Sequence, residues 1–129
     1  TCFTLSLDNL SELTKRFGYT VGDGVLKDFA GLVQLMGDTE GMRGYNGVGR
    51  FVVFFEECSS KKAAAMIRIL DNQVEEYNSL NPEYPIRYTA AWATTEETDT
   101  YEIRELLRLS QKKWKQMEKE KKDKTEEET

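Results

Sequence analysis

The 129-residue sequence contains no histidine. This absence excludes Ser–His and Cys–His nucleophile pairs, imidazole general bases and histidine-ligated zinc. Its two cysteines, Cys2 and Cys58, are too few for a disulfide framework and lack the spacing of metal ligands. We therefore expect both to be small buried apolar residues in a reducing compartment.

Long apolar runs and an excess of basic residues are also missing. No segment approaches the ~18 consecutive apolar residues that a membrane-spanning helix requires, and the chain does not open with a signal-peptide pattern. Eighteen basic residues stand against 23 acidic ones, for a formal net charge of −5. Nucleic-acid binding normally needs a basic face, so neither nucleic acid nor a membrane is an expected partner of this segment.

What the sequence does contain is typical of one globular domain. Apolar residues make up 39% of the chain and charged residues 32%, and 129 residues suffice for a single hydrophobic core. We expect residues 1–117 to form the domain, as part of a longer multidomain protein. From Glu118 the sequence is almost wholly lysine and glutamate, so we expect residues 118–129 to be a charged, disordered tail. Because the cysteines indicate a reducing compartment, we expect this segment to be cytoplasmic, although the longer protein could be tethered to a membrane.

The apolar spacing predicts the order strand, helix, helix, strand, strand, helix, strand, helix. Apolar residues alternate over 1–8, recur at helical spacing over 9–18 and 22–36, and form a continuous run over 51–55. A third helix is expected from Ser59 or Ser60 to about Leu80, a strand over 86–93 and a last helix from about Thr100. This alternation indicates an α/β fold, and we expect a mixed central sheet with one hairpin and helices on its faces.

Two segments together resemble the GGDEF domain family, the fold of diguanylate cyclases. FGYTVGDGVL follows a first helix as the family's aromatic-Gly-x-x-x-Gly-Asp-x-x-Leu run does, and NGVGRF falls where the family has its G-G-(D/E)-E-F hairpin. TAAWA and the last helix also lie where the family has its fourth strand and final helix. The resemblance covers nearly the whole chain. It implies a palm-like fold of the nucleotide-cyclase type and a role in bacterial cyclic di-GMP signalling.

The resemblance implies a reaction in which two GTP molecules condense across two facing domains, with Mg²⁺ held by carboxylates. Attack of a 3′-hydroxyl on an α-phosphate builds charge on phosphate oxygens, which the metal ions stabilise. The family's first metal-binding aspartate falls here on Ser6, and its acid in the hairpin falls on Gly49. Because Mg²⁺ needs hard oxygen ligands, the resemblance implies lost metal ligands, no cofactor and no catalytic residues.

Other signature positions are partly retained. In the hairpin, Gly47 and Phe51 match the family, whereas Val48 replaces the second glycine and Arg50 replaces the glutamate. The family's phosphate-binding lysine falls on Ser11 and its guanine-binding asparagine on Thr14, while the R-x-x-D product-inhibition motif would fall on residues 38–41, which read DTEG. A remnant nucleotide site would therefore consist of four residues: Asp8, Asn9, Asp23 and Arg50.

Each remnant residue also has a purely structural alternative. Asp23 could be the N-cap of the second helix, and Asp8 and Asn9 could simply start the first helix. Arg50 could bind a phosphate bidentately without metal, or could be an exposed arginine that protects a hairpin edge. The functional hypotheses are an inactive regulatory module that docks on a neighbouring domain or forms a homodimer, a GTP-sensing module controlling an attached EAL-type phosphodiesterase, and, least favoured, an active cyclase.

Overall fold

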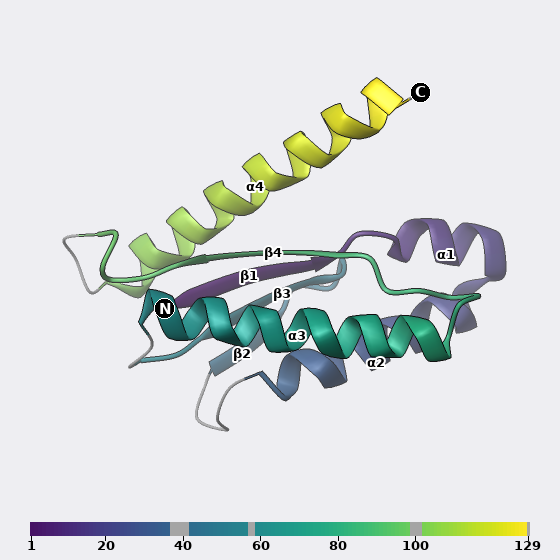
Figure 1. Ribbon diagram of the computed structural model, residues 1–129, viewed down its shortest axis with the longest axis horizontal. Helices are drawn as coiled ribbons and strands as arrows, with labels where there is room; N and C mark the ends of the chain where they lie inside the picture. Colours follow the sequence, from purple (N-terminus) through teal and green to yellow (C-terminus); the bar gives the residue numbers. More distant parts are fainter. Residues whose placement is uncertain (37–41, 57–58, 99–101, 129) are drawn as a thin grey trace.

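The computed structural model describes residues 1–36, 42–56, 59–98 and 102–128. The element order is the predicted one, and Figure 1 shows its layers. The elements are the strands β1 (Cys2–Leu7), β2 (Met42–Tyr45), β3 (Arg50–Phe54) and β4 (Tyr88–Ala93) and the helices α1 (Leu10–Phe17), α2 (Tyr19–Gln34), α3 (Ser60–Leu80) and α4 (Ile103–Glu128).

The sheet has the strand order β2-β3-β1-β4, and every described pair is antiparallel. The α/β class and the hairpin are confirmed, but the sheet is not mixed as expected. Helical crossovers do connect strands that run in the same direction, β1 with β2 and β3 with β4. In this sheet each such pair is separated by one strand of opposite direction, so no two parallel strands are neighbours.

Helices cover both faces of the sheet, which explains why every residue of β1 is buried. On the face of α2 and α3, the core is built by apolar side chains that alternate along the strands and recur along the helices. Its fully buried members include Phe3, Leu5, Phe29, Val53 and Leu70. This is the alternation that the sequence predicts for residues 1–8.

The opposite face of the sheet carries smaller side chains. It is crossed by α4, which lies above the strands in Figure 1. Here β1 and β4 present Cys2, Thr4, Ala91 and Ala93, all buried. Small side chains let a helix approach a sheet closely, and the hydroxyls of Thr4 and Ser110 on α4 lie 2.8 Å apart. The prediction that Cys2 is buried is confirmed, whereas Cys58 lies outside the described residues.

The start of α2 differs from its prediction. The helix begins at Tyr19 rather than near Gly24, so Asp23 lies inside it and is not its N-cap. Gly18, at φ +94°, makes the sharp break between α1 and α2 that only glycine adopts readily. The first turn of α2 contains the exposed Tyr19 and is followed by two glycines. The helical spacing of apolar residues therefore does not extend to this turn, and the sequence does not reveal the start of the helix.

The charged C-terminal segment also differs from its prediction. Residues 118–128 continue α4 rather than forming a disordered tail, and the last turns of the helix project beyond the sheet (Figure 1). The side chain of Lys121 returns to the sheet, where its ammonium group donates to the Tyr88 carbonyl at 2.9 Å. None of the helices in the described part of the chain is long and apolar enough to cross a membrane.

Candidate functional site

The signature turn connects β2 to β3 and is held against the end of β1. Gly47 and Gly49 have φ angles of +88° and +77°, which favour glycine. The Leu7 amide donates to the Gly49 carbonyl at 2.8 Å, and the Gly49 amide donates to the Tyr45 hydroxyl at 3.1 Å. A Cβ at Gly49 would lie 3.3 Å from Leu10 Cδ2 and 3.4 Å from the Leu7 carbonyl oxygen. Position 49 therefore has little room for a side chain.

The other positions of the turn divide into exposed and buried. Val48 is exposed over 68% of its surface, and Phe51 is 8% exposed. The Phe51 ring packs against Tyr45 and Phe29, with centroid distances of 4.9 and 5.5 Å. Phe51 thus anchors the hairpin in the core, while its neighbour Arg50 points to the opposite face.

Ser6 is buried at the end of β1 and has its hydroxyl engaged in two hydrogen bonds. It accepts from the Trp114 indole Nε1 at 2.7 Å and donates to Asp8 Oδ1 at 2.6 Å. The second oxygen of Asp8 accepts from the Thr89 hydroxyl at 2.5 Å. The Asp8 carboxylate is therefore already bound to two hydroxyl donors of the protein.

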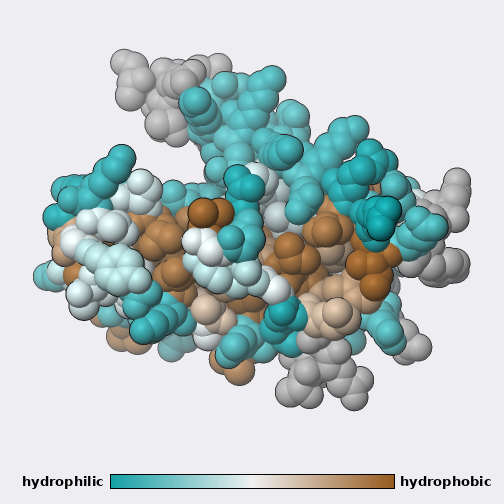
Figure 2. All heavy atoms as spheres, turned by 180° about the vertical axis from the view of Figure 1, so that it is seen from behind, coloured by the Kyte–Doolittle hydropathy of each residue, from teal (hydrophilic) through white to brown (hydrophobic). Residues whose placement is uncertain are grey.

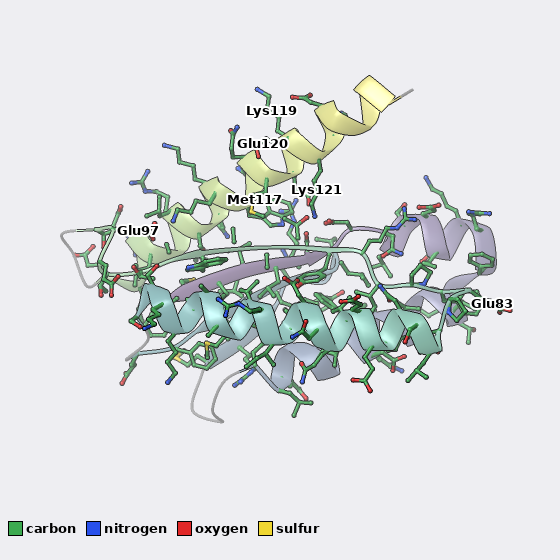
Figure 3. All side chains as sticks on the ribbon, viewed as in Figure 1. Glu83, Glu97, Met117, Lys119, Glu120 and Lys121 are labelled. Carbon is green, nitrogen blue, oxygen red and sulfur yellow. The ribbon has the colours of Figure 1, made fainter. Side chains whose placement is uncertain are left out.

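One cationic side chain lies on each side of Ser6 and Asp8. Arg50 is the register partner of Ser6 on β3, and its guanidinium covers the Trp114 ring with Cζ 4.2 Å from the centroid. On the β4 side, the Lys121 ammonium lies 2.6 Å from the Thr89 hydroxyl and 3.5 Å from Asp8 Oδ2. Figure 3 shows Lys121 on the side of α4 that faces the sheet. We call the six residues the β1-end cluster: Ser6, Asp8, Arg50, Thr89, Trp114 and Lys121.

Glu118 adds a second carboxylate beside this cluster. Burial raises its pKa; Asp8 raises it further, and the Thr89 hydroxyl and Lys121 oppose the shift. Its Oε1 is buried and has no hydrogen-bond partner among the described residues. Proton uptake by Glu118 is therefore easier in the folded protein than in a free glutamate.

Sequence reasoning missed the contribution of α4. The helical spacing of Trp114, Glu118 and Lys121, at i, i+4 and i+7, places all three on one face of a helix. That signal was available, but the high charge of the segment indicated a solvated surface instead.

Two of the four predicted remnant residues have other partners. The Asn9 side chain is 8% exposed, donates to the Pro85 carbonyl at 2.7 Å and accepts from the Arg87 amide at 3.2 Å. Asp23 forms an ion pair with Lys27, with 3.1 Å between Nζ and Oδ2. The structure therefore places Asp8 and Arg50 in one cluster, whereas Asn9 ties α1 to the segment before β4 and Asp23 pairs along α2.

The chain was compared with models of known protein families. Its sequence matches the family described as "Diguanylate cyclase, GGDEF domain" over residues 1–124. The chain belongs to the GGDEF domain family. Among curated proteins, no relative matches it.

Solved structures of GGDEF domains share the fold. One is titled the active GGEEF domain of a diguanylate cyclase from Vibrio cholerae; the match has a TM-score of 0.76 at 19% identity and covers 92% of this chain and 76% of that one. Another is the GGDEF domain of DgcB from Caulobacter crescentus in complex with c-di-GMP, with a TM-score of 0.59 at 14% identity, covering 70% of this chain and 56% of that one. At these identities the likeness establishes the fold alone.

The residues present do not fit the metal ions that the GGDEF family implies. At the two positions where the resemblance implies acidic metal ligands, this chain has Ser6, whose hydroxyl is engaged, and Gly49, which has no side chain. No group of three or more potential His, Cys, Asp or Glu ligands occurs within the described residues. Arg50 and Lys121 place two positive charges beside Ser6, where they offset the carboxylates of Asp8 and Glu118.

Proposed function

We propose that this GGDEF domain is a non-catalytic regulatory and interaction module in cyclic di-GMP signalling. It would bind neighbouring domains of the same protein or a second GGDEF domain, rather than two GTP molecules in a reactive geometry. The fold is kept while the groups that would stabilise charge on a reacting phosphate are not, and their loss commonly costs orders of magnitude in rate.

The observation that carries this proposal is the pair of Ser6 and Gly49 at the end of β1. A lone substitution could be compensated by a nearby acid, but the carboxylate of Asp8 is already bonded to Ser6 and Thr89. At Gly49, the φ of +77° strains any side chain, and the contact with Leu10 leaves an acidic side chain little room. The proposal therefore takes both positions that the resemblance implies to be acidic as lost together.

A second candidate is a nucleotide sensor, and the two cations of the β1-end cluster favour it. Arg50 and Lys121 flank Ser6, where family members have metal-bound phosphates, and arginine can bind a phosphate through two parallel hydrogen bonds. Arg50 would then hold GTP without metal, and binding would alter the activity of an attached domain, such as an EAL-type phosphodiesterase.

Calorimetric titration of GTP into the purified domain, with Mg²⁺ and with EDTA, separates these functions when run beside an assay for cyclic di-GMP. We expect no cyclic di-GMP with Mg²⁺ or Mn²⁺, and product formation by homogeneous protein would overturn the proposal. Metal-independent binding without turnover would select the sensor, whereas no binding at millimolar GTP would leave the interaction module.

The variants Arg50→Glu and Asp23→Ala test whether a sensor uses these two remnant residues. Arg108→Glu is a matched control, because Arg108 is an exposed arginine on α4 whose side chain pairs with Glu105. A sensor that uses Arg50 loses affinity in Arg50→Glu and keeps it in Arg108→Glu. The oligomeric state, measured by light scattering over a concentration series, tests whether the partner is a second copy.

A further inference from the structure

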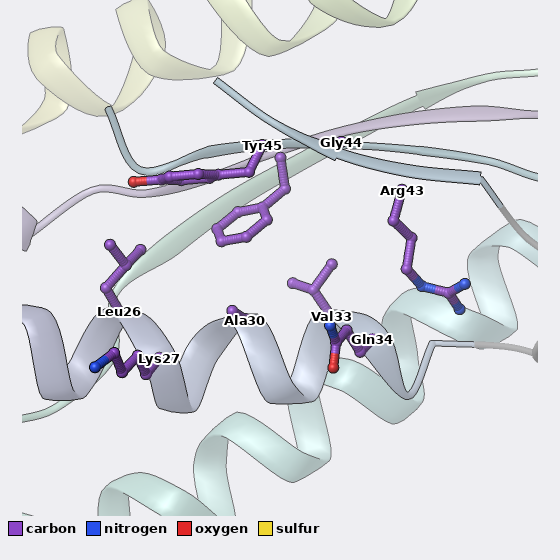
Figure 4. Close-up of a pocket in the computed structure, with 9 residues that line it drawn as sticks. Leu26, Lys27, Ala30, Val33, Gln34, Arg43, Gly44 and Tyr45 are labelled. Carbon is purple, nitrogen blue, oxygen red and sulfur yellow. The ribbon is translucent and has the colours of Figure 1, made fainter. Parts of the chain in front are cut away.

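The sheet has two edge strands, β2 and β4, and they are protected differently. β2 spans only four residues and lies toward the back of Figure 1, on the side seen in Figure 2, where apolar surface gathers across the middle. Beside it, a slot of about 320 Å³ separates α2 from the β2–β3 hairpin (Figure 4). A strand this short offers few backbone groups to a partner, which is one way in which proteins blunt an edge.

The other edge strand, β4, is longer and carries no charge of its own. Its six residues read YTAAWA, and none of them is charged or a proline. An uncharged edge strand of this length pairs readily with a strand of another chain unless something covers its free backbone groups. The protection of β4 must therefore come from another element of the fold.

Alternate residues of β4 direct their backbone groups away from the sheet. The Asp8 amide donates to the Arg87 carbonyl at 2.7 Å, so the backbone groups of residue 87 face β1. Facing residues alternate in an antiparallel pair, which leaves the N–H and C=O groups of Tyr88, Ala90 and Trp92 at the outer edge. These are the groups that a further strand would use.

Two lysines of α4 bind the outer carbonyls near the two ends of this edge. The Lys113 ammonium donates to the Trp92 carbonyl at 3.0 Å. The Lys121 ammonium donates to the Tyr88 carbonyl at 2.9 Å. The spacings match, because eight residues of helix rise about 12 Å and four residues of strand span about 13 Å. Helix α4 thus runs antiparallel to β4 and places one lysine at each of these carbonyls.

Open space adjoins the edge where the first lysine reaches it. A hollow of about 490 Å³ lies there, and its lining residues include Ala91, Trp92, Lys113 and Met117. Lys113 is held beside the hollow by an ion pair with Glu97. The outer carbonyls are therefore occupied by long side chains that can leave, and not by a packed wall.

We propose that α4 caps the β4 edge and thereby prevents β4 from pairing with β4 of a second copy of this chain. A second copy fits because the edge is self-complementary. Antiparallel pairing centred on Ala90 places Tyr88 of each copy opposite Trp92 of the other, and aromatic cross-strand pairs are favourable. Displacement of α4, whose last turns project beyond the sheet, would withdraw the lysines and open the edge. This role is independent of nucleotide binding and of catalysis.

The test compares two double variants of the whole chain by analytical ultracentrifugation over a concentration series. Lys113→Met with Lys121→Met removes the cap. Lys112→Met with Lys119→Met is the control, because it removes two exposed lysines from the same helix and changes the net charge equally; Figure 3 shows Lys119 on the side of α4 away from the sheet. We expect the uncapped variant to self-associate at least about tenfold more tightly than the wild type, because pairing no longer has to displace charge-assisted contacts. The control should match the wild type.

Hydrogen exchange followed by NMR locates the contact. In the uncapped variant, the outward amides of Ala90 and Trp92 should become protected as the concentration rises, whereas the amide of Ala91, which faces β1, should not change. Circular dichroism checks the fold, and if the double variant is unfolded, Lys113→Met alone is compared with Lys112→Met alone. Association no tighter than that of the wild type, equal association of the control, or association without protection of Ala90 would overturn the proposal.

Discussion

The guanidinium of Arg50 lies over the Trp114 ring, and the indole of Trp114 donates its hydrogen to Ser6. Three elements, β3, α4 and β1, are thereby joined at the end of β1. A cation–π contact of this kind contributes about 0.5–2 kcal/mol, more when it is desolvated.

Trp114→Phe removes the indole donor and part of the ring that Arg50 covers. Because Trp114 is 7% exposed and Ser6 is buried, we expect a loss of about 1–3 kcal/mol in the free energy of unfolding. Urea unfolding followed by circular dichroism measures it. A double-mutant cycle with Arg50→Met should give a coupling of roughly 0.5–1 kcal/mol, and strictly additive effects would contradict the stacking contact.

Gly49→Glu places an acid in the hairpin, and we predict that it does not create a cyclase. The φ of +77° and the contacts with Leu10 and Leu7 strain any side chain there, so we expect destabilisation by about 1–3 kcal/mol. Thermal unfolding and the cyclic di-GMP assay are the measurements. Val48→Glu is the matched control: its side chain is 68% exposed, and its stability should change by less than about 0.5 kcal/mol.

Gly22 and Gly24 lie two residues apart in α2, and their replacement by alanine should have opposite effects on stability. A Cβ at Gly22 would lie 2.3 Å from Thr14 Oγ1 on α1, whereas a Cβ at Gly24 meets nothing within 4 Å. Gly24→Ala should stabilise by about 0.5–1 kcal/mol through helix propensity, and Gly22→Ala should destabilise by roughly 1–3 kcal/mol. Thr14→Ala should rescue part of the Gly22→Ala loss, and equal effects at both glycines would refute the close contact.

Glu118→Gln should stabilise the domain at pH 7 but not at pH 4. Burial raises the pKa of Glu118 in the folded state, so the fold binds this proton more tightly than the unfolded chain does. Stability is therefore lost as pH rises from the unfolded pKa through the folded pKa, and the amide avoids that loss. We expect roughly 0.5 kcal/mol, because the residue is partly exposed and solvent screens the effect.

The control for this pH dependence is Glu120→Gln, an exposed glutamate on the same helix. Its thermal stability should show no comparable difference between pH 4 and pH 7. A gain in Glu118→Gln that is the same at both pH values would instead assign the effect to packing of the amide.

The sequence by itself determined the element order, the α/β class, the core face of β1 and the family to which the chain belongs. These follow from local patterns: apolar periodicity along the chain and glycines at fixed offsets, each of which is written in consecutive residues. The prediction that Ser6 and Gly49 stand where the family has acids also came from the sequence, because it concerns only the identity of the residues at two positions.

Only the tertiary structure decided what surrounds those positions. The first turn of α2, which begins at Tyr19, packs Gly22 closely against Thr14, a contact between helices that no local pattern shows. The antiparallel sheet depends on which strands become neighbours. The roles of Trp114 and Lys121 depend on where α4 crosses the sheet, more than 100 residues after Ser6 and Asp8. Side chains so far apart in sequence meet only through the packing of the whole chain, and a charged helix face gives no local sign of the surface that it will cover.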